Sequence, residues 1–299
     1  MQGQIVRALS EFYEVTLENA QMITCKARGR FRKNEETPLV GDWVTITKTT
    51  ENSGMIDQIH KRKNRFVRPP VANIDTMILL ASAVNPVTDP FLLDRITAIA
   101  ESKDVQPIIC INKSDLDPGD TLFDVYTKAG FFTLRTSAKS GEGVDALYRE
   151  ISGKVCAFVG NSGVGKSSIL NALEPGFAAK TAAVSEKLGR GKHTTRHVEL
   201  FSLGGDTQIA DTPGFSSFDL GMMEFGAKEE LQYAFRDFAS YLGACRFRDC
   251  IHVGEVDCAV KQAVLERKIA ETRHQSYVRL FGMLSEVKSW ERAKGTPQK

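Results

Sequence analysis

Residues 155–168 read VCAFVGNSGVGKSS, and this stretch decides the fold of the chain. An apolar run is followed by a glycine-rich turn and then by the apolar spacing of a helix, which includes Ile169. The pattern G-x-x-x-x-G-K-S between a strand and a helix is typical of a phosphate-binding loop. Glycine lets successive backbone N–H groups converge on an anion, and the positive end of the helix dipole adds to their attraction. The sequence therefore predicts an α/β domain that binds a nucleotide.

The polar residues of this loop have expected roles. Lys166 would reach the β- and γ-phosphates, and the Ser167 hydroxyl would ligate Mg²⁺. The loop residues expected to contact the nucleotide are Gly160, Asn161, Ser162, Gly163, Val164, Gly165, Lys166, Ser167 and Ser168. A chance glycine turn is the alternative, but it does not require the lysine, the serine and both flanking elements together.

The composition is that of a globular protein. Hydrophobic residues make up 42% of the 299 residues and charged residues 25%, which favours two or three domains. The formal net charge of +2 means that any nucleic-acid binding must depend on local patches. No apolar run approaches the ~20 residues that span a bilayer, and the first residues do not resemble a secretion signal. Six cysteines in such a chain do not indicate a disulfide scaffold, so we expect the reducing cytoplasm. We also expect a monomer and no membrane partner.

Residues 1–67 are expected to form a small β-barrel such as the OB-fold. Five or so short strands separated by turn residues are expected here, with examples at residues 4–9, 13–17, 22–27 and 43–47. Basic side chains recur at residues 61–65 and also surround Phe31, where they are Lys26, Arg28, Arg30, Arg32 and Lys33. Such a surface can hold phosphates and stack a base, which indicates RNA binding. A solvated rim on a barrel that binds protein or nothing fits equally well.

Residues 68–220 alternate between predicted strands and helices. Arg68-Pro69-Pro70 interrupts the chain and marks the boundary with the barrel. Predicted strands lie at residues 74–82, 107–111, 131–134, 155–159 and 207–210, and predicted helices at 90–103, 120–129 and 144–151. This alternation indicates a parallel sheet, in which ligands bind at the carboxyl ends of the strands.

The strand at 107–111 ends in a candidate guanine-reading motif, Asn112-Lys113-Ser114-Asp115. The Asp115 carboxylate can accept hydrogen bonds from N1–H and the exocyclic amine of guanine, whereas adenine lacks the N1 donor and would leave the carboxylate unpaired. Asn112 would tie this loop either to the base or to the phosphate loop, and the Lys113 stem would pack on the base. Taken alone, the motif is better explained as a polar turn that caps a helix.

The motif is not alone, because Ser137-Ala138-Lys139 follows the next predicted strand. The backbone N–H groups of this turn would bind the guanine O6. The alternative is an ordinary loop between a strand and a helix. The two motifs together favour a guanine nucleotide, with Asn112 to Asp115 and Ser137 to Lys139 as its base-binding residues.

Two segments beyond the phosphate loop would sense the γ-phosphate. Residues 174–198 are polar and glycine-rich, and we expect them to order around the γ-phosphate and Mg²⁺, with Thr195 favoured over Thr194 as a metal ligand. A disordered linker is the alternative. After the strand at 207–210, Asp211 would hold Mg²⁺ through water, and the Gly214 N–H would contact the γ-phosphate.

The residue that orients the attacking water is not obvious. Phe215 stands where many regulatory GTPases carry a glutamine, and a phenyl ring cannot make the hydrogen bond to water. His193 is the nearest titratable candidate, since neutral imidazole can orient water or accept a proton. A surface histidine without a role is equally compatible. The candidate catalytic residues are therefore His193, Thr195 and Lys166.

The order of the motifs indicates a circular permutation. In the usual order of guanine-nucleotide-binding proteins the phosphate loop comes first, whereas here N-K-S-D and S-A-K precede it. The original ends would be joined across Ser152-Gly153, and the chain would be cut after Gly214. Such a rearrangement is tolerated because domain termini often lie close together on the surface.

Residues 221–299 are expected to form a small helical domain that binds zinc. Cys245, Cys250, His252 and Cys258 lie within 14 positions. Three thiolates and one imidazole suit a structural Zn²⁺ without an open position, although buried or free cysteines are the alternative. Helices are predicted at 221–238 and 259–288, the second of which is amphipathic. Arg246, Phe247, Arg248 and the basic tail could face RNA.

At this point the residues resemble a known bacterial family, the ribosome small-subunit-dependent GTPase A. The resemblance rests on the permuted motif order between an OB-like domain and a C-x4-C-x-H-x5-C unit, and it covers essentially the whole chain. It implies a slow GTPase that is stimulated by the 30S subunit and acts late in its maturation, with 16S rRNA contacts through the barrel and the zinc domain. In that family a histidine of the first switch is the suspected catalytic residue, which corresponds to His193.

We therefore expect a Mg²⁺-dependent GTPase that binds GTP, GDP and the 30S subunit. The zinc unit follows the nucleotide-sensing loop, so hydrolysis would reorient it and lower its affinity for RNA. An RNA-binding module with a structural guanine-nucleotide site is the first alternative, and phosphate release measured with and without 30S subunits separates the two. An ATP-dependent enzyme is the second alternative, and competition between ATP and GTP tests it.

Overall fold

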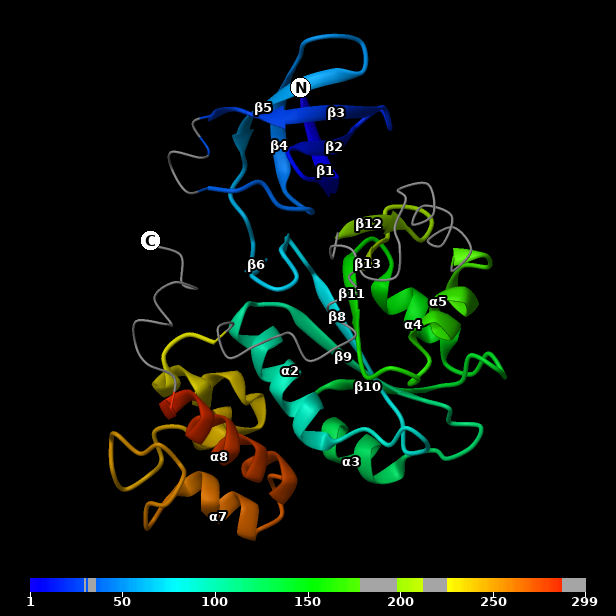
Figure 1. Cartoon of the computed structure of the whole chain (residues 1–299). Coiled ribbons are helices and arrows are strands. Elements are labelled where there is room, and N and C mark those ends of the chain that lie inside the picture. Colours follow the sequence, from blue (N-terminus) through cyan, green and yellow to red (C-terminus); the bar gives the residue numbers. More distant parts are fainter. Residues whose placement is uncertain (30, 32–35, 178–197, 212–224, 287–299) are drawn as a thin grey trace.

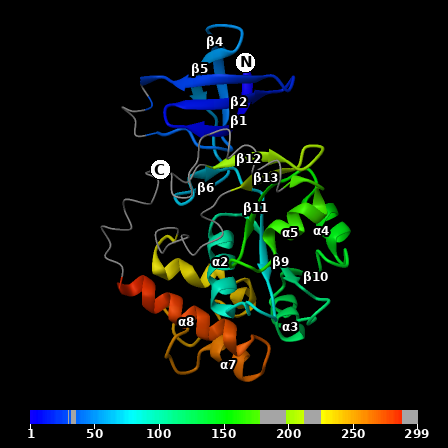
Figure 2. The same ribbon diagram turned by 45° about the vertical axis from the view of Figure 1, so that its right-hand side comes forward.

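The computed structural model describes residues 1–29, 31, 36–177, 198–211 and 225–286. Figure 1 shows a barrel of N-terminal residues above a sheet flanked by helices, and a helical part formed by the C-terminal residues below it. The turned view in Figure 2 shows the same three parts, with the helical part beside α2 (Pro90–Ser102). Among the described residues, no helix is both long and apolar enough to cross a membrane.

The N-terminal barrel is built from five strands. They are β1 (Gln2–Leu9), β2 (Phe12–Leu17), β3 (Met22–Ala27), β4 (Trp43–Lys48) and β5 (Ser53–Ile59). The ring closes because β1 pairs with both β2 and β4, and β3 pairs with β5. Alternate side chains face inward, so Ile5, Val15 and Ile23 are fully buried. The predicted barrel is confirmed. The number of strands is as expected, and only the location of β5 was not named in advance, because Asp57 and Gln58 obscure its apolar alternation.

A short hairpin connects the barrel to the second part of the chain. It consists of β6 (Arg65–Phe66) and β7 (Val71–Ala72), and Arg68-Pro69-Pro70 lies in its turn. Val40 of the barrel also forms a bridge with Val71. The predicted interruption at residue 68 therefore falls inside a hairpin that contacts the barrel.

The central sheet has the predicted parallel arrangement. Its parallel strands are β8 (Thr76–Ala81), β9 (Gln106–Asn112), β10 (Phe132–Thr136), β11 (Val155–Val159) and β13 (Gln208–Asp211). The strand order is β10-β9-β8-β11-β13, so the carboxyl ends of all five strands meet at one edge. Every residue of β8 is buried, as expected for a strand covered on both faces.

Helices cover both faces of this sheet. One face carries α2 and α3 (Asp120–Lys128), and the other carries α4 (Val144–Ile151) and α5 (Lys166–Leu173). The start of α2 follows local rules, because the Asp89 side chain accepts the Phe91 N–H and Pro90 occupies the first turn. The strands that end in N-K-S-D and S-A-K precede the phosphate loop in the chain. They nevertheless belong to the same sheet as β11, the strand that leads into this loop.

The barrel joins the edge of this sheet. Strand β12 (Glu199–Ser202), which the sequence did not predict, pairs antiparallel with β13 and contacts β1 where Arg7 lies opposite Glu199. The Arg7 guanidinium forms ion pairs with Glu14 and Glu199. Strand β12 was hidden in the sequence because it is only four residues long and includes a charged residue and a serine.

The C-terminal part differs from the two long helices expected. Where one helix was predicted over 221–238, the described residues form two 3-10 segments, η2 (Lys228–Ala234) and η3 (Arg236–Tyr241). The helix predicted over 259–288 is also wrong, because it divides into α7 (Ala259–Leu265) and α8 (Glu271–Glu286). Arg267 has a positive φ of 57°, and the N–H groups of Lys268 and Ile269 both bond to Ala263 O. This left-handed C-cap turns the chain and buries Ile269.

Candidate functional site

The phosphate loop lies at the carboxyl edge of the sheet, between β11 and α5. Gly160 has little space, since a Cβ there would lie 2.6 Å from Leu80 O. Gly165 has φ +102°, and its Cβ would lie 2.2 Å from Asn112 Nδ2. Only glycine fits these two positions without moving a neighbour. The tight loop therefore requires the glycines that the motif specified.

The Lys166 ammonium lies inside this loop. It donates hydrogen bonds to Gly160 O at 2.6 Å and Asn161 O at 2.8 Å. Burial lowers the pKa of Lys166 below its ordinary value. Ser167 and Ser168 are exposed in the first turn of α5, where a hydroxyl and backbone N–H groups are available to a ligand. The arrangement offers a cation and helix N–H groups to a polyphosphate.

Asn112 links the two halves of the candidate site. Its side-chain Nδ2 donates to Val164 O at 2.8 Å, and its Oδ1 accepts from the Thr136 hydroxyl at 3.3 Å. The side chain is buried, with a residue exposure of 2%. Of the two roles left open by the sequence, the structure shows contact with the phosphate loop.

The two motifs expected to read the base also meet. The Ser137 hydroxyl donates to Asp115 Oδ1 at 2.7 Å, and Lys139 Nζ lies 4.0 Å from Asp115 Oδ2. Lys113 has a positive φ of 65°, and its ammonium donates to Asn85 O at 2.6 Å. A carboxylate can accept about four hydrogen bonds. The Asp115 carboxylate therefore retains acceptor sites for a ligand besides its hydrogen bond from Ser137.

Several predicted site residues lie outside the described residues. They are His193, Thr194, Thr195, Gly214 and Phe215, together with the barrel residues Arg30, Arg32 and Lys33. Asp211 ends β13, and the Ala210 beside it pairs with Ala157 of β11. The end of β13 thus lies next to the strand that leads into the phosphate loop.

A second candidate site gathers the three cysteines and the histidine of the C-terminal part. The ligand atoms of Cys245, Cys250, His252 and Cys258 all lie within 4.8 Å of one another. His252 Nδ1 lies 3.5, 3.5 and 3.3 Å from the sulfur atoms of Cys245, Cys250 and Cys258. A tetrahedral zinc ion with ordinary bond lengths would separate S from N by about 3.6 Å. The cluster therefore fits a four-coordinate cation.

The surroundings of the cluster also suit a metal. His252 Nε2 lies 2.9 Å from Gln232 Oε1, which fixes the imidazole with Nδ1 facing the sulfur atoms. Burial lowers the pKa of His252, which favours the neutral ring that binds metals. Burial, together with the neighbouring thiols, raises the pKa of Cys250 to about 12. A cation at the centre would stabilise the thiolates that this environment otherwise disfavours.

Sequence reasoning missed the residues that support both sites. Asn85 and Thr136 hold the nucleotide loops, and Gln232 orients the metal-binding histidine. None of them belongs to a motif, and Gln232 is 20 residues away from His252. The sequence signals only that a metal-binding histidine needs a hydrogen-bond partner for its second ring nitrogen. It does not show which residue provides that partner.

Two family models of known proteins together match most of the chain. The family model described as RsgA GTPase matches residues 59–221, and the one described as RsgA N-terminal domain matches residues 2–56. The small ribosomal subunit biogenesis GTPase RsgA of Geobacillus kaustophilus is 43% identical over 293 residues, covering 96% of this chain and 98% of the relative. That of Bacillus subtilis is 42% identical over 297 residues, with coverage of 96% and 98%.

Two solved structures share the fold. YjeQ from Thermotoga maritima superposes with a TM-score of 0.80 and 34% identity, covering 96% of this chain and 99% of that chain. YloQ, described as a circularly permuted GTPase, has a TM-score of 0.77 and 36% identity, covering 100% of this chain and 96% of that chain. The permutation inferred from the motif order is confirmed by this likeness.

Proposed function

The chain belongs to the RsgA family of GTPases, and from this premise we propose that it acts in late maturation of the 30S ribosomal subunit, which stimulates its activity. It is a ribosome-assembly GTPase that hydrolyses GTP to GDP. One observation carries the assignment to this site. Asp115 and Ser137, from the ends of neighbouring strands, are hydrogen-bonded at the same edge of the sheet as the phosphate loop.

The proposed binding mode uses the contacts already described. Asp115 reads the guanine, while Lys166 and the N–H groups of the phosphate loop and α5 stabilise charge on the phosphates. Mg²⁺ bound with GTP would neutralise charge on the β- and γ-phosphates. Oxygen donors suit this ion, and Ser167, Thr195 and Asp211 are the proposed ligands. His193 is proposed to orient water and Gly214 to contact the γ-phosphate.

The first prediction concerns the base. Asp115→Asn should lower the affinity for GDP by about 100-fold, because the amide cannot accept the two guanine hydrogen bonds in the same way. Affinity for xanthosine diphosphate should rise, since xanthine carries an acceptor in place of the amine. Competition against a fluorescent nucleotide measures both. An unchanged preference for GDP would remove Asp115 from the proposed base-reading set.

We further propose 16S rRNA as the nucleic-acid partner. On the barrel, Lys26 Nζ lies 4.8 Å from the centre of the Phe12 ring, and Phe12 is 44% exposed. In the metal-binding part, Arg246 lies 5.6 Å from the ring of Phe247, which is 43% exposed. Exposed aromatic rings beside cations can stack bases and hold phosphates. One of these surfaces lies on the barrel and the other on the metal-binding part, at opposite ends of the molecule (Figure 1), and both support the proposal.

The metal proposed for the Cys245 cluster is zinc, one per chain, in a structural role. Three sulfur ligands and one nitrogen favour this ion, and all four protein ligands would fill its coordination sphere. Because 30S subunits mature in the cytoplasm, we propose that location. A monomer is proposed as well, and light scattering of the purified protein checks it.

The second prediction tests the function as a whole. Purified 30S subunits should increase phosphate release from GTP with a saturable dependence, while ATP should neither be hydrolysed at a comparable rate nor displace GTP. The control is Lys166→Ala, which removes a cation from the phosphate loop and should abolish the stimulated rate. An RNA-binding module with a structural nucleotide would show no phosphate release in either condition, and that result would disprove the proposed function.

A further inference from the structure

A hydrogen bond between Ser114 and Glu142 links the two loops proposed to read the base, and the binding mode above gives no role to the Ser114 hydroxyl or to the Glu142 carboxylate. Ser114 Oγ lies 2.7 Å from Glu142 Oε2 and 3.0 Å from Thr136 O, so the hydroxyl proton is shared between two acceptors. Ser114 precedes Asp115 at the end of β9, whereas Glu142 lies beyond β10, and the two are 28 residues apart. The contact adds a side-chain link between two loops that are also joined by the Ser114 N–H to Thr136 O hydrogen bond and by the Ser137 hydroxyl to Asp115.

Glu142 also holds the second loop through its main chain. Its carbonyl oxygen accepts the Ser137 N–H at 3.0 Å, and the Ser137 hydroxyl in turn donates to Asp115 Oδ1 at 2.7 Å. The contacts form a closed ring: Ser114 to Glu142, Glu142 to Ser137, Ser137 to Asp115, and back through the peptide bond to Ser114. The position of Asp115 is therefore restrained by its own hydrogen bond from Ser137 and by the hydrogen bond between the preceding residue, Ser114, and Glu142.

We propose that Ser114 and Glu142 are a positioning pair that aims the Asp115 carboxylate and thereby sets the selectivity for guanine over bases that lack its exocyclic amine. The inference rests on the proposed binding of GTP. The Asp115 side chain is partly exposed, so the surrounding protein does not fix its direction by packing. A carboxylate that accepts two hydrogen bonds from one base must have a defined orientation, whereas a single hydrogen bond can form over a wider range of orientations. Loss of the pair should therefore affect guanine more than hypoxanthine, which offers only N1–H.

The experiment compares GDP with inosine diphosphate in the full-length protein. Glu142→Ala and Ser114→Ala should each lower the affinity for GDP by about three- to tenfold, the usual effect of an unfixed side chain, with a smaller change for inosine diphosphate. In 30S-stimulated hydrolysis, KM for GTP should rise while kcat stays the same. The double variant should be no worse than either single variant, because both remove the same contact.

Two controls separate the contact from charge and from folding. Glu142→Gln keeps a hydrogen-bond acceptor for Ser114 and should retain the selectivity. Glu150→Ala removes a glutamate at the opposite edge of the sheet, where it bonds to Gln106 and Lys154, and should leave selectivity unchanged. Thermal unfolding checks that each variant is folded.

The inference is overturned if Glu142→Ala changes the affinities for GDP and inosine diphosphate equally, or changes neither. It is also overturned if Glu142→Gln behaves like Glu142→Ala, because the effect would then come from charge. A failure of the proposed function looks different, since the wild-type protein would itself show no preference for guanine nucleotides over ATP.

Discussion

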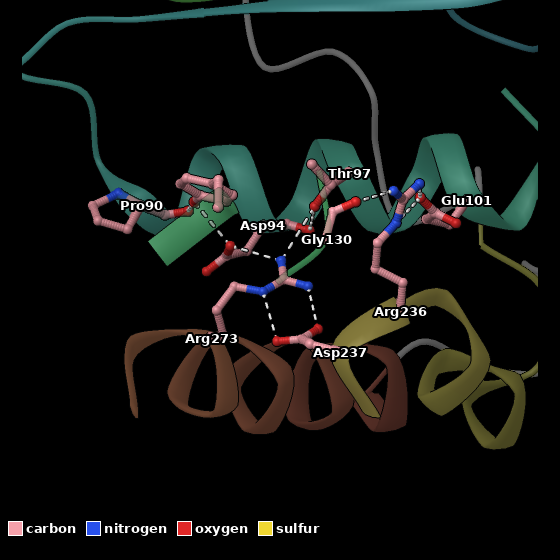
Figure 3. Close-up of polar contacts among 9 residues, drawn as sticks. Pro90, Asp94, Thr97, Glu101, Gly130, Arg236, Asp237 and Arg273 are labelled. Carbon is pink, nitrogen blue, oxygen red and sulfur yellow. Dashed lines mark hydrogen bonds and ion pairs between the residues drawn. The ribbon is translucent and has the colours of Figure 1, made fainter. Parts of the chain in front are cut away.

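Replacing Arg273 with methionine should lower the free energy of unfolding by about 3–5 kcal/mol, the usual effect of removing one partner from a buried ion pair. Arg273 belongs to α8 and is 1% exposed. Its Nη1 lies 2.9 Å from Asp94 Oδ1, and its Nη2 lies 2.6 Å from Asp237 Oδ1. Figure 3 shows the guanidinium between these two carboxylates, with α2 on one side and the C-terminal part on the other. The variant would leave both carboxylates buried without their cation.

Further contacts make this network specific. Tyr126 of α3 donates to Asp94 Oδ1 at 2.9 Å, and the guanidinium carbon of Arg273 lies 4.7 Å from the centre of the Phe235 ring. Burial alone lowers the pKa of Arg273, but Asp237 and Asp94 raise it above the ordinary value, so the guanidinium stays charged. Methionine fills part of the volume and replaces none of the hydrogen bonds.

The decrease in the free energy of unfolding caused by Arg273→Met should depend on pH. Burial raises the pKa of Asp94 above its ordinary value of 3.8, and Arg273 opposes that rise. Without Arg273 the folded-state pKa would rise further above the unfolded value. A carboxyl group whose pKa is higher in the folded state than in the unfolded state stabilises the fold at pH values below its unfolded-state pKa. That stabilisation is lost as the pH rises through its folded-state pKa. The deficit of the variant should therefore be larger at about pH 8 than at about pH 5.

Urea unfolding followed by circular dichroism measures this loss, and hydrogen exchange locates it in α8 and α2. The matched control is Arg236→Met, in which the ion pair to Glu101 is partly exposed and should contribute about 1 kcal/mol or less. Equal losses for Arg236→Met and Arg273→Met would mean that burial does not govern the interaction. A variant as stable as the wild type would show that the buried network contributes nothing net.

The same network bears on the expected movement of the C-terminal, metal-binding unit. The sequence suggested that GTP hydrolysis would reorient this unit. Arg273 anchors α8 on α2 through its buried ion pair with Asp94, so a movement of the whole unit away from α2 would have to break that pair. The pair between Arg273 and Asp237 lies inside the unit and would move with it. Such a movement would require several kcal/mol from the change of nucleotide. The loop of residues 242–258, which contains neither helix nor strand, carries no such buried anchor to α2 among the described contacts.

Local patterns account for what could be predicted. The phosphate loop, N-K-S-D and S-A-K each need fixed residues at short spacing, and the parallel sheet then brings their loops to one edge. The broken helix after Leu265 was missed because Arg267 gives no sign of a left-handed conformation in the sequence. Contacts such as Arg273 with Asp94, 179 residues apart, depend on which helix faces which, and no local pattern specifies that.

Cys250→Ser should remove the metal from the purified protein and unfold the C-terminal loop. Residues 242–258 contain neither helix nor strand, and the four candidate ligands lie together in this loop, where the His252 ring contacts Phe238 and Tyr277. Zinc binding to such a site contributes about 10–16 kcal/mol in small zinc-binding peptides, far more than the local packing could supply. A hydroxyl in place of one thiolate leaves three ligands and an open position.

Elemental analysis should therefore give about one zinc per chain in the wild type and much less in Cys250→Ser, with faster hydrogen exchange over residues 242–265. The matched control is Cys25→Ala, which removes a buried barrel thiol remote from the cluster and should leave the zinc content unchanged. Guanine nucleotide affinity should survive in Cys250→Ser, because the phosphate loop and the base-reading loops belong to the central sheet. Full zinc content in Cys250→Ser, or another metal in the wild type, would contradict the assignment of a Cys3His zinc site.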